Sequence, residues 1–255
     1  MVDQVDSSNP LVSVVMPSYN SFYSIERSVL SVLSQTYLNL ELIIIDDGSE
    51  DETRSLLKRM ASIDSRIKLV LNDINVGVAK ARNQAIGMAV GDYIAFLDSD
   101  DIWLPFKLES QINIMISKGK YVSHTSYVRK DQDLNKSLGI VIAKKCVTYL
   151  DMLSDNYIGN LTGIYNCKVL GKIYQESVGH EDYLMWLDII RKADSIGLEG
   201  VMAEYRVSNS SLSSNKFKAV LWHYNILRYR VEVSKLESFK FTLRYIYRAI
   251  RKRYF

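Results

Sequence analysis

Short apolar runs that alternate with helical periodicity dominate the first hundred residues of the chain. The apolar runs occupy residues 11–16, 40–45, 67–71 and 93–97, and apolar residues at helical spacing lie between them. Strands that alternate with helices in this way form parallel βαβ units. We therefore predict an α/β fold, with an open, doubly wound, mostly parallel sheet flanked by helices.

The elements expected around and beyond these strands follow from the same periodicity. The predicted helices cover residues 22–33, 51–61, 78–90 and 104–117. Beyond residue 117 the pattern weakens. The remaining predicted elements are strands at 121–128 and 161–165, a helix over 182–192, and one or two helices from residue 217.

Three carboxylates follow the strand predicted at 93–97. Asp98, Asp100 and Asp101 come after a run without polar alternation, which is typical of a parallel strand buried on both faces. Ligands bind outside the carboxyl ends of such strands, so these side chains are expected at a crevice. Carboxylates so close together repel each other unless a cation such as Mg²⁺ or Mn²⁺ lies beside them, often with substrate phosphates. The alternative is a turn in which Asp101 caps a helix that begins near Leu104.

The sequence predicts neither an export signal nor a transmembrane helix. Residues 1–10 carry two aspartates and no lysine or arginine, and no apolar stretch approaches the roughly 18 residues that span a bilayer. Cys146 and Cys167 have a spacing that matches no metal motif, and we expect both to be free thiols. The predicted location is therefore cytoplasmic.

Basic residues are concentrated at the C-terminal end of the chain. Residues 216–255 hold 11 Lys or Arg against two Glu, whereas the formal net charge of the whole chain is only +3. The same segment is rich in aromatic residues, and this combination on a helix favours the surface of an anionic membrane. A solvated helix packed on the sheet is the alternative. Nucleic acid would also attract such a tail, but the acidic body and the absence of a nucleic-acid motif argue against that partner.

A series of short motifs appears in order over residues 11–110. The motifs are Val14-Val15-Met16-Pro17-Ser18-Tyr19-Asn20, Gln35-Thr36-Tyr37, Ile45-Asp46-Asp47-Gly48-Ser49, Gly77, Arg82-Asn83 and Phe96-Leu97-Asp98-Ser99-Asp100-Asp101. They resemble the nucleotide-sugar half of the inverting family 2 glycosyltransferases, which have the GT-A fold. The resemblance implies a catalytic domain over 1–215, with a nucleotide-sugar half at 11–110 and an acceptor half at 111–215, followed by the basic tail 216–255.

The resemblance implies a set of residues that bind the nucleotide sugar. They are Pro17, Tyr19, Asn20, Asp46, Asp47, Arg82, Asp98 and Ser99. Asp47, or alternatively Asp46, would accept a hydrogen bond from the uracil edge, and Arg82 would lie near the base and phosphates. The other interpretations are an ordinary β-turn for Tyr19 and Asn20, helix capping for Asp46, and a solvated helix charge for Arg82.

The resemblance also implies a metal site and a catalytic base. Asp100 is the expected direct ligand of a divalent ion, Mn²⁺ or Mg²⁺, while Asp98 contacts the ribose or the metal through water. Asp182 matches the base that takes the proton from an acceptor hydroxyl. Without the resemblance, Glu181 and Asp182 would be explained by the favourable charge at a helix N-terminus.

Further residues are implied on the acceptor side of the site. They are Glu181, Trp186, Tyr205 and Arg206. Trp186 is interpreted either as a floor for the acceptor sugar or as a core residue. Many family members carry a histidine two residues after the arginine, able to reach the metal. Ser208 stands there in this chain, which leaves the third protein ligand open.

The activity implied is the inverting transfer of a hexose from a UDP-sugar to a hydroxyl of an acceptor sugar, with a β-linkage in the product. Galactose and glucose are the favoured hexoses. The acceptor sugar is expected on a polyprenyl diphosphate of O-antigen or other surface-polysaccharide synthesis, with the basic tail holding the protein peripherally on the inner face of the cytoplasmic membrane. The alternative is a nucleotide-sugar-binding or nucleotidyl-transferring protein with the same sheet and no glycosyl transfer.

Overall fold

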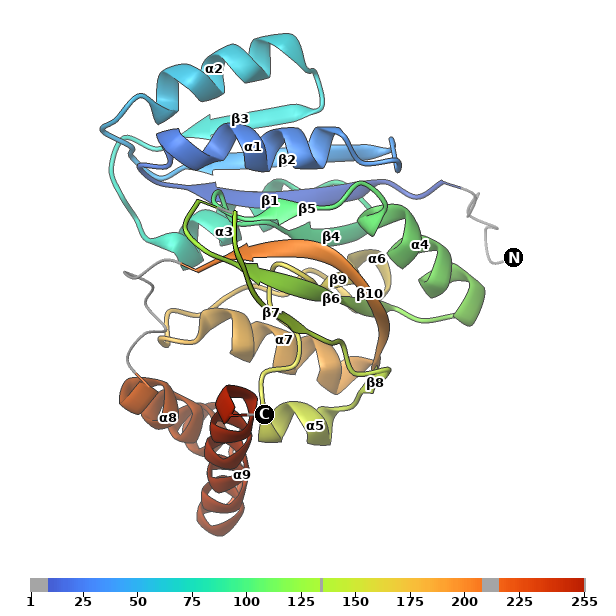
Figure 1. Ribbon diagram of the computed structural model, residues 1–255, viewed down its shortest axis with the longest axis vertical. Helices are drawn as coiled ribbons and strands as arrows, with labels where there is room; N and C mark the ends of the chain where they lie inside the picture. The colour runs from blue at the N-terminus through green and yellow to red at the C-terminus, as the bar shows by residue number, and fades with distance from the viewer. Residues whose placement is uncertain (1–8, 134, 208–215, 255) are drawn as a thin grey trace.

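A ten-stranded sheet runs through the computed structural model, which describes residues 9–133, 135–207 and 216–254 (Figure 1). The strands are β1 (Val12–Ser18), β2 (Leu40–Asp46), β3 (Ile67–Leu71), β4 (Tyr93–Phe96), β5 (Ile102–Trp103), β6 (Val122–Lys130), β7 (Ser137–Val141), β8 (Cys146–Val147), β9 (Ile164–Asn166) and β10 (Ser195–Arg206). The helices are α1 (Phe22–Leu33), α2 (Thr53–Ile63), α3 (Val78–Met88), α4 (Lys107–Lys118), α5 (Tyr149–Ser154), α6 (Cys167–Leu170), α7 (Glu181–Lys192), α8 (Lys216–Asn225), the π-helical segment η2 (Ile226–Arg230) and α9 (Lys235–Tyr254).

The first four strands form the parallel half of the sheet. The strand order is β3-β2-β1-β4-β9-β6-β10-β5, with β7 beside β6 and β8 beside β10. β1 pairs in parallel with β2 and β4, so that Val14 lies between Leu42 and Ala95. β9 runs antiparallel to both of its neighbours, and the second half of the sheet is mixed. The α/β architecture predicted from the sequence is confirmed.

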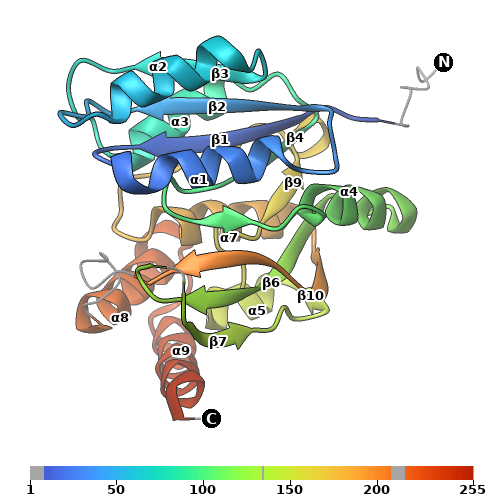
Figure 2. The same ribbon diagram turned by 45° about the horizontal axis from the view of Figure 1, so that its top comes forward.

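Side chains of the parallel strands alternate between two cores. On β1, Val12, Val14 and Met16 face the core that contains α1, α2 and α4, whereas Val15 faces the core that contains α3 and α7. Helices α1 and α3 accordingly lie on opposite faces of the sheet (Figure 2). All four side chains are fully buried. Because both faces are covered, the strand has no solvent-exposed side that would show as polar alternation.

Several elements of the second half were not predicted from the sequence. β7, β8, α5 and α6 are short, and β10 contains Gly197 and Gly200 without regular alternation. The pairing of β10 with β6 shifts register after Leu198 and again after Val201. A strand with such irregular pairing has neither a period of two nor a continuous apolar run, so its sequence does not indicate it.

The basic C-terminal segment packs against the rest of the protein. α9 contacts α5 and α8, and the helices lie at the lower end of the molecule in Figure 1. Ile226 and Leu227 are buried in the core that contains α7. The segment is therefore attached by an apolar contact in addition to the covalent chain. Residues 208–215, where the predicted boundary falls, lie outside the described residues.

Two further sequence expectations concern membrane spans and cysteines. No helix within the described residues is both long and apolar enough to cross a bilayer. Cys146 and Cys167 are free, as predicted. Cys146 is exposed, whereas burial raises the pKa of Cys167 to about 11, so this thiol stays protonated.

Candidate functional site

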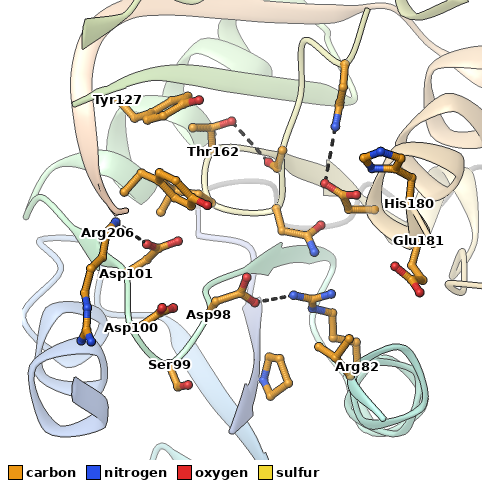
Figure 3. A pocket seen from close by; sticks show the side chains of 18 of the residues that line it. Arg82, Asp98, Ser99, Asp100, Asp101, Tyr127, Thr162, His180, Glu181 and Arg206 are labelled. Carbon is orange, nitrogen blue, oxygen red and sulfur yellow. Dashed lines mark hydrogen bonds and ion pairs between the residues drawn. The ribbon is translucent and has the colours of Figure 1, made fainter. Parts of the chain in front are cut away.

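A cleft of about 1030 Å³ opens at the carboxyl ends of β1, β2 and β4. Its walls come from the loops after these strands, from α3, from the first turn of α7 and from the end of β10 (Figure 3). This is the end of a parallel sheet at which ligands bind. The predicted site residues that line the cleft are Pro17, Tyr19, Asn20, Asp47, Arg82, Asp98, Ser99, Asp100, Glu181, Asp182, Tyr205 and Arg206.

The loop after β1 presents Tyr19 and Asn20 to the cleft. Tyr19 is 46% exposed, so a face of its ring is available for stacking. Asn20 has a φ of 45°, and its backbone N–H donates to Ser49 Oγ at 2.9 Å. The side-chain oxygen of Asn20 accepts from the backbone N–H of Glu50 at 2.9 Å. Asn20 therefore joins the loops after β1 and β2 in addition to lining the cleft.

Asp46 does not line the cleft, and its assignment as a nucleotide ligand was wrong. It is fully buried, and its carboxylate accepts from both the backbone N–H and the hydroxyl of Ser49. It also pairs with Arg54 Nε at 3.1 Å. Successive side chains of an extended strand point to opposite sides, so only Asp47 can face the cleft. Asp46 also does not cap α2, whose N-cap is Glu52.

Asp47 faces the cleft while it holds the loop before α3. Its Oδ1 accepts from the backbone N–H of Val76 at 2.9 Å and from Asn72 Nδ2 at 3.2 Å, and its Oδ2 accepts from the N–H of Gly77 at 2.8 Å. A carboxylate has about four acceptor positions. The carboxylate is therefore fixed in place and can still accept from one further donor.

Arg82 reaches from α3 to Asp98, which follows β4 (Figure 3). Arg82 Nη2 donates to Asp98 Oδ1 at 2.5 Å, and Nη1 donates to Gln175 Oε1 at 3.2 Å. Burial opposes its charge, but the carboxylates of Asp98, Asp182 and Glu181 raise its pKa above the usual value. The side chain is only 9% exposed, so the interpretation as a solvated helix charge was wrong. A charged, planar fork in this position suits a phosphate oxygen.

Asp98, Asp100 and Asp101 lie in one loop at the base of the cleft (Figure 3). Burial and the charge of Asp98 raise the pKa of Asp100. Burial, with the charges of Asp100 and Asp98, raises the pKa of Asp101 well above its usual value. Asp101 Oδ1 accepts from the backbone N–H of Arg206 at 2.9 Å. Asp101 thus joins this loop to the end of β10 and does not cap α4, which begins at Lys107.

The acidic loop is suited to a divalent cation. The raised pKa of Asp100 reflects how unfavourable it is to bury neighbouring carboxylates without a positive charge beside them. The oxygens of Asp98 and Asp100 are ligands of the kind that Mg²⁺ and Mn²⁺ prefer. Within the described part of the chain, no group of three or more His, Cys, Asp or Glu side chains could hold a metal. The loop therefore offers the carboxylates of Asp98 and Asp100 as oxygen ligands. Ser208 lies outside the described residues.

The first turn of α7 places Glu181 and Asp182 at the cleft, with Glu181 across from the acidic loop (Figure 3). Asp182 Oδ2 accepts a long hydrogen bond of 3.4 Å from Asn156 Nδ2. A carboxylate that is oriented but only weakly bonded can accept a proton from an alcohol. Both acids also lie at a helix N-terminus, where negative charge is favourable, so the two interpretations from the sequence are compatible.

Trp186 does not line the cleft, and its assignment to the acceptor side was wrong. Its ring is fully buried and packs edge-on against Phe96 and Tyr165, at centroid distances of 5.9 and 6.2 Å. α7 runs from the cleft into the core, so one turn beyond Asp182 its side chains meet β4 and β9. The indole N–H of Trp186 donates to Asn160 Oδ1 at 3.1 Å, and Asn160 lines the cleft. Trp186 therefore supports the cleft from behind.

Tyr205 and Arg206 line the cleft at the end of β10. The ring of Tyr205 packs edge-on against Tyr127 at 6.1 Å. Burial and the charges of Asp101 and Asp100 raise the pKa of Tyr205 to about 12, so its hydroxyl stays protonated and can donate. Arg206 Nε is buried and has no hydrogen-bond partner among the described residues. These two residues add donors beside the acidic loop.

Sequence reasoning missed two parts of the cleft wall. One part comes from β6, β7 and the residues that follow them, and consists of Thr125, Tyr127, Gln132, Val141, Ile142, Ala143 and Lys144. The other consists of Asn156, Tyr157, Asn160, Leu161 and Thr162 from the loop after α5, together with His180 and the tail residue Trp222. Residues 155–160 have neither strand nor helix periodicity. The strand predicted at 161–165 begins only at Ile164, so Leu161 and Thr162 belong to the loop. Trp222 carries no local signal at all, because only tertiary packing brings α8 to the cleft.

Comparison with known proteins identifies relatives along nearly the whole chain. The sequence profile described as "Glycosyl transferase family 2" matches residues 13–164. The UDP-Glc:alpha-D-GlcNAc-diphosphoundecaprenol beta-1,3-glucosyltransferase WfgD of Escherichia coli is 40% identical over 247 residues, which cover 96% of each chain. The putative teichuronic acid biosynthesis glycosyltransferase TuaG of Bacillus subtilis is 39% identical over 96% of this chain and 98% of its own.

A solved structure shares the fold at low sequence identity. The crystal structure of S. aureus TarS 1-349 in complex with UDP-GlcNAc superposes with a TM-score of 0.71 and 19% identity, over 91% of this chain and 70% of that chain. At this identity the likeness concerns the fold alone. The GT-A fold expected from the motifs is confirmed.

Proposed function

Because the chain belongs to glycosyl transferase family 2, we propose that it transfers a glucosyl group from UDP-glucose to a sugar hydroxyl on a polyprenyl diphosphate carrier. The main support is the cleft, in which the Arg82–Asp98 pair and the acidic loop lie on one side and Asp182 on α7 lies on another. The Escherichia coli relative, which its name describes as a glucosyltransferase acting on N-acetylglucosamine-diphosphoundecaprenol, favours glucose over galactose and a β-1,3 linkage.

The loops after the parallel strands would bind the nucleotide of the donor. The exposed ring face of Tyr19 would stack on the uracil, and Asp47 would accept from the uracil N–H with its remaining acceptor position. Pro17, Asn20 and Ser99 line the same part of the cleft and would contact the base and ribose. Each of these groups would contact the UDP moiety, which is common to all UDP-sugars. This part of the cleft would therefore bind free UDP as well.

The diphosphate would lie between the acidic loop and Arg82. Asp100, with Asp98, would hold a divalent cation, whose positive charge would stabilise the negative charge that develops on the leaving diphosphate. Arg82 would exchange part of its contact with Asp98 for a phosphate oxygen. Arg206, at the end of β10, lies close enough to the acidic loop for its backbone to bond Asp101, and its side chain would add positive charge there.

Asp182 would act as the general base. As the acceptor oxygen bonds to the anomeric carbon, its proton passes to the Asp182 carboxylate, and the bond from that carbon to the diphosphate oxygen breaks. Attack from the side opposite the leaving group inverts the anomeric configuration, so an α-linked donor yields a β-linked product. Glu181 would bind the acceptor beside the base.

The exposed face of α9 would place the cleft near a membrane. Its exposed apolar side chains follow a helical spacing and are Leu236, Phe239, Leu243 and Tyr247. Lys240 and Arg244 are exposed beside them. An apolar stripe bordered by basic residues suits the interface of an anionic bilayer. We place the protein peripherally on the cytoplasmic face, where a lipid-linked acceptor would be reached.

The proposal is tested by measuring UDP release with a panel of UDP-sugars, Mn²⁺, and a short-chain alkyl diphosphate of N-acetylglucosamine as acceptor. We expect release from UDP-glucose that depends on the acceptor, and a β-linked disaccharide product. Asp182→Asn should lower transfer by about a hundredfold or more, because the base is lost, while UDP binding changes little.

Asp188→Asn is the matched control for this substitution. Asp188 lies on the same helix, outside the cleft, so the same change of carboxylate to amide should leave transfer nearly intact. Full activity in Asp182→Asn would refute the assignment of the base. UDP binding without transfer to any acceptor would instead favour a nucleotide-sugar-binding protein.

A further inference from the structure

The tail residue Trp222 lies directly on the turn that precedes the proposed base. A Cβ added to Gly179 would lie 2.4 Å from Trp222 Cε2 and 2.6 Å from its Nε1, so the ring covers this glycine closely. Gly179 also has a φ of +93°, a backbone conformation that residues with a side chain rarely adopt. Glycine is therefore needed here both for the backbone conformation and for the contact with the indole.

The indole also contacts His180 and forms part of the cleft. The rings of Trp222 and His180 are perpendicular, with centroids 5.2 Å apart. His180 is the N-cap of α7, and Glu181 and Asp182 follow it in the first turn. Trp222 and these three residues all line the cleft. The half-buried ring of Trp222 thus packs against Gly179 and His180, which directly precede the first turn of α7 that carries the proposed base.

Of the three tryptophans of the chain, only Trp222 lines the cleft. Trp103 is 2% exposed and Trp186 is fully buried, and neither lines the cleft. The donor side, with Tyr19, is built from loops after the parallel strands, whereas Trp222 belongs to α8. Its location is therefore the wall beside α7, where an acceptor would approach Asp182.

The contacts of α8 and α9 hold this ring in place. His223 is stacked between Tyr183 of α7 and Tyr245 of α9, at centroid distances of 5.4 and 4.4 Å. Arg230, at the end of η2, forms an ion pair with Glu176 in the loop before α7. Tail residues thus contact the segment on both sides of Gly179. A fixed ring costs little conformational entropy when it binds a ligand.

We propose that Trp222 is the platform of the acceptor-sugar subsite, so that the basic tail is part of the active site as well as a membrane contact. One face of a pyranose ring carries C–H groups and packs on an aromatic face, while its hydroxyls need polar partners at the edge. His180 and Glu181 are the polar groups beside the indole. This inference depends on the proposed transfer to a sugar, but the role of Trp222 can fail independently of it.

The test compares Trp222→Ala, Trp222→Phe and the wild-type protein with the acceptor analogue used above. We expect Trp222→Ala to raise the KM for the acceptor by about tenfold or more, and to change the KM for UDP-glucose by less than about twofold. Trp222→Phe should recover most of the acceptor affinity, because it restores an aromatic face. A ring that only supports the fold would change both KM values and the thermal midpoint together.

Tyr229→Ala is the matched control, since Tyr229 is an aromatic residue of the same tail that is 68% exposed and outside the cleft. It should leave both KM values unchanged. Binding of the acceptor analogue is also followed directly by tryptophan fluorescence, whose change should disappear in Trp222→Phe. An unchanged acceptor KM and an unchanged fluorescence response in the Trp222 variants would overturn the inference. Absence of transfer by the wild-type protein would overturn the proposed function instead.

Discussion

The carboxylates around the cleft differ in how firmly their neighbours hold them. Asp46 is bonded to Ser49 and Arg54, and Asp47 accepts three hydrogen bonds from the loop before α3. Asp182, by contrast, is held by a contact of 3.4 Å. Firmly bonded carboxylates fix the shape of the site, and a weakly bonded one remains available for proton transfer. The number and length of its hydrogen bonds therefore distinguish Asp182 from the acids that fix the loops.

Gly48 is a residue at which the shape of the site depends on the absence of a side chain. It has a φ of +78°, and a Cβ there would lie 2.7 Å from the backbone of both Ile74 and Asn75. Gly48→Ala should lower the free energy of unfolding by about 2 kcal/mol or more, because backbone rather than a flexible side chain would have to move. It should also weaken UDP binding, since the displaced loop bonds Asp47. Denaturant titration and UDP calorimetry measure the two effects.

Gly87→Ala provides the comparison for Gly48→Ala. Gly87 lies within α3, and a Cβ there would meet nothing within 4 Å. Alanine is the better helix former, so this variant should be equal to the wild-type protein or more stable by up to about 1 kcal/mol. Equal destabilisation by both substitutions would contradict the argument from close backbone contact.

At the level of elements, a buried histidine joins α8 to α7 and α9. His223 Nε2 lies 3.3 Å from the hydroxyl of Tyr183, and Nδ1 lies 3.3 Å from Thr242 Oγ1. Burial, with the nearby His180, lowers the pKa of His223 to about 4. The neutral ring is therefore the form that the packed tail requires. Burial lowers the pKa of His124, which lies on β6, to about 4 as well.

These shifts predict a fold that loses stability in acid. Each histidine has a folded-state pKa below the value of 6.5 expected for the unfolded chain, so the unfolded state binds more protons between these pH values. The free energy of unfolding should fall as pH drops from about 6.5 toward 4, by roughly 2 kcal/mol per histidine at about pH 5. No such change is expected from these residues above pH 7 or so.

His223→Phe separates the contribution of this residue from that of His124. Phenylalanine keeps the stacked ring but cannot be protonated, so the loss of stability between about pH 7.5 and 5 should shrink by roughly half. Denaturant titrations at the two pH values give the difference directly. Parallel pH curves for the variant and the wild-type protein would show that His223 is not the buried, neutral group described here.

At the scale of the whole molecule, α9 and α2 lie at opposite ends of the protein (Figure 1). Lys240→Glu with Arg244→Glu should weaken binding to vesicles of anionic lipid by about thirtyfold or more, because each basic residue near the surface contributes roughly 1 kcal/mol. Salt should also weaken the binding of the wild-type protein to these vesicles, because it screens the charges. Vesicle sedimentation at two salt concentrations measures both effects. Removal of the whole tail would be a poor test, because the tail also contributes Trp222 to the cleft.

A double substitution on α2 is the control for the α9 variant, because it changes the net charge by the same amount. Lys58 and Arg59 are both exposed, and Lys58→Glu with Arg59→Glu alters the net charge by the same amount at the far end. This variant should bind the vesicles almost as the wild-type protein does. If both double variants lose binding equally, the attraction is a property of net charge and α9 is not the contact.

Local sequence patterns were sufficient to predict the parallel half of the protein and most of the residues that line the cleft at the ends of these strands. Strands β1, β2 and β4 are buried on both faces, so their runs are mostly apolar, and polar residues follow at their carboxyl ends. The loop acids Asp98 and Asp100, with Asp182 at a helix start, were identified from local patterns and motif order. Such features depend on residues close in the chain, which is why sequence alone reveals them.

Which side chains face the cleft, and which distant segments form its walls, depended on tertiary packing. Asp46 could bind a nucleotide and Trp186 could stack on a sugar, but the Asp46 side chain bonds to Ser49 in the turn and the Trp186 ring lies in the core. The packing of neighbouring elements sets the direction in which these side chains point. Trp222 is 40 residues from Asp182 and reaches the cleft through the packing of α8 and α9. Local periodicity carries no information about such contacts, which arise when distant apolar surfaces are buried together.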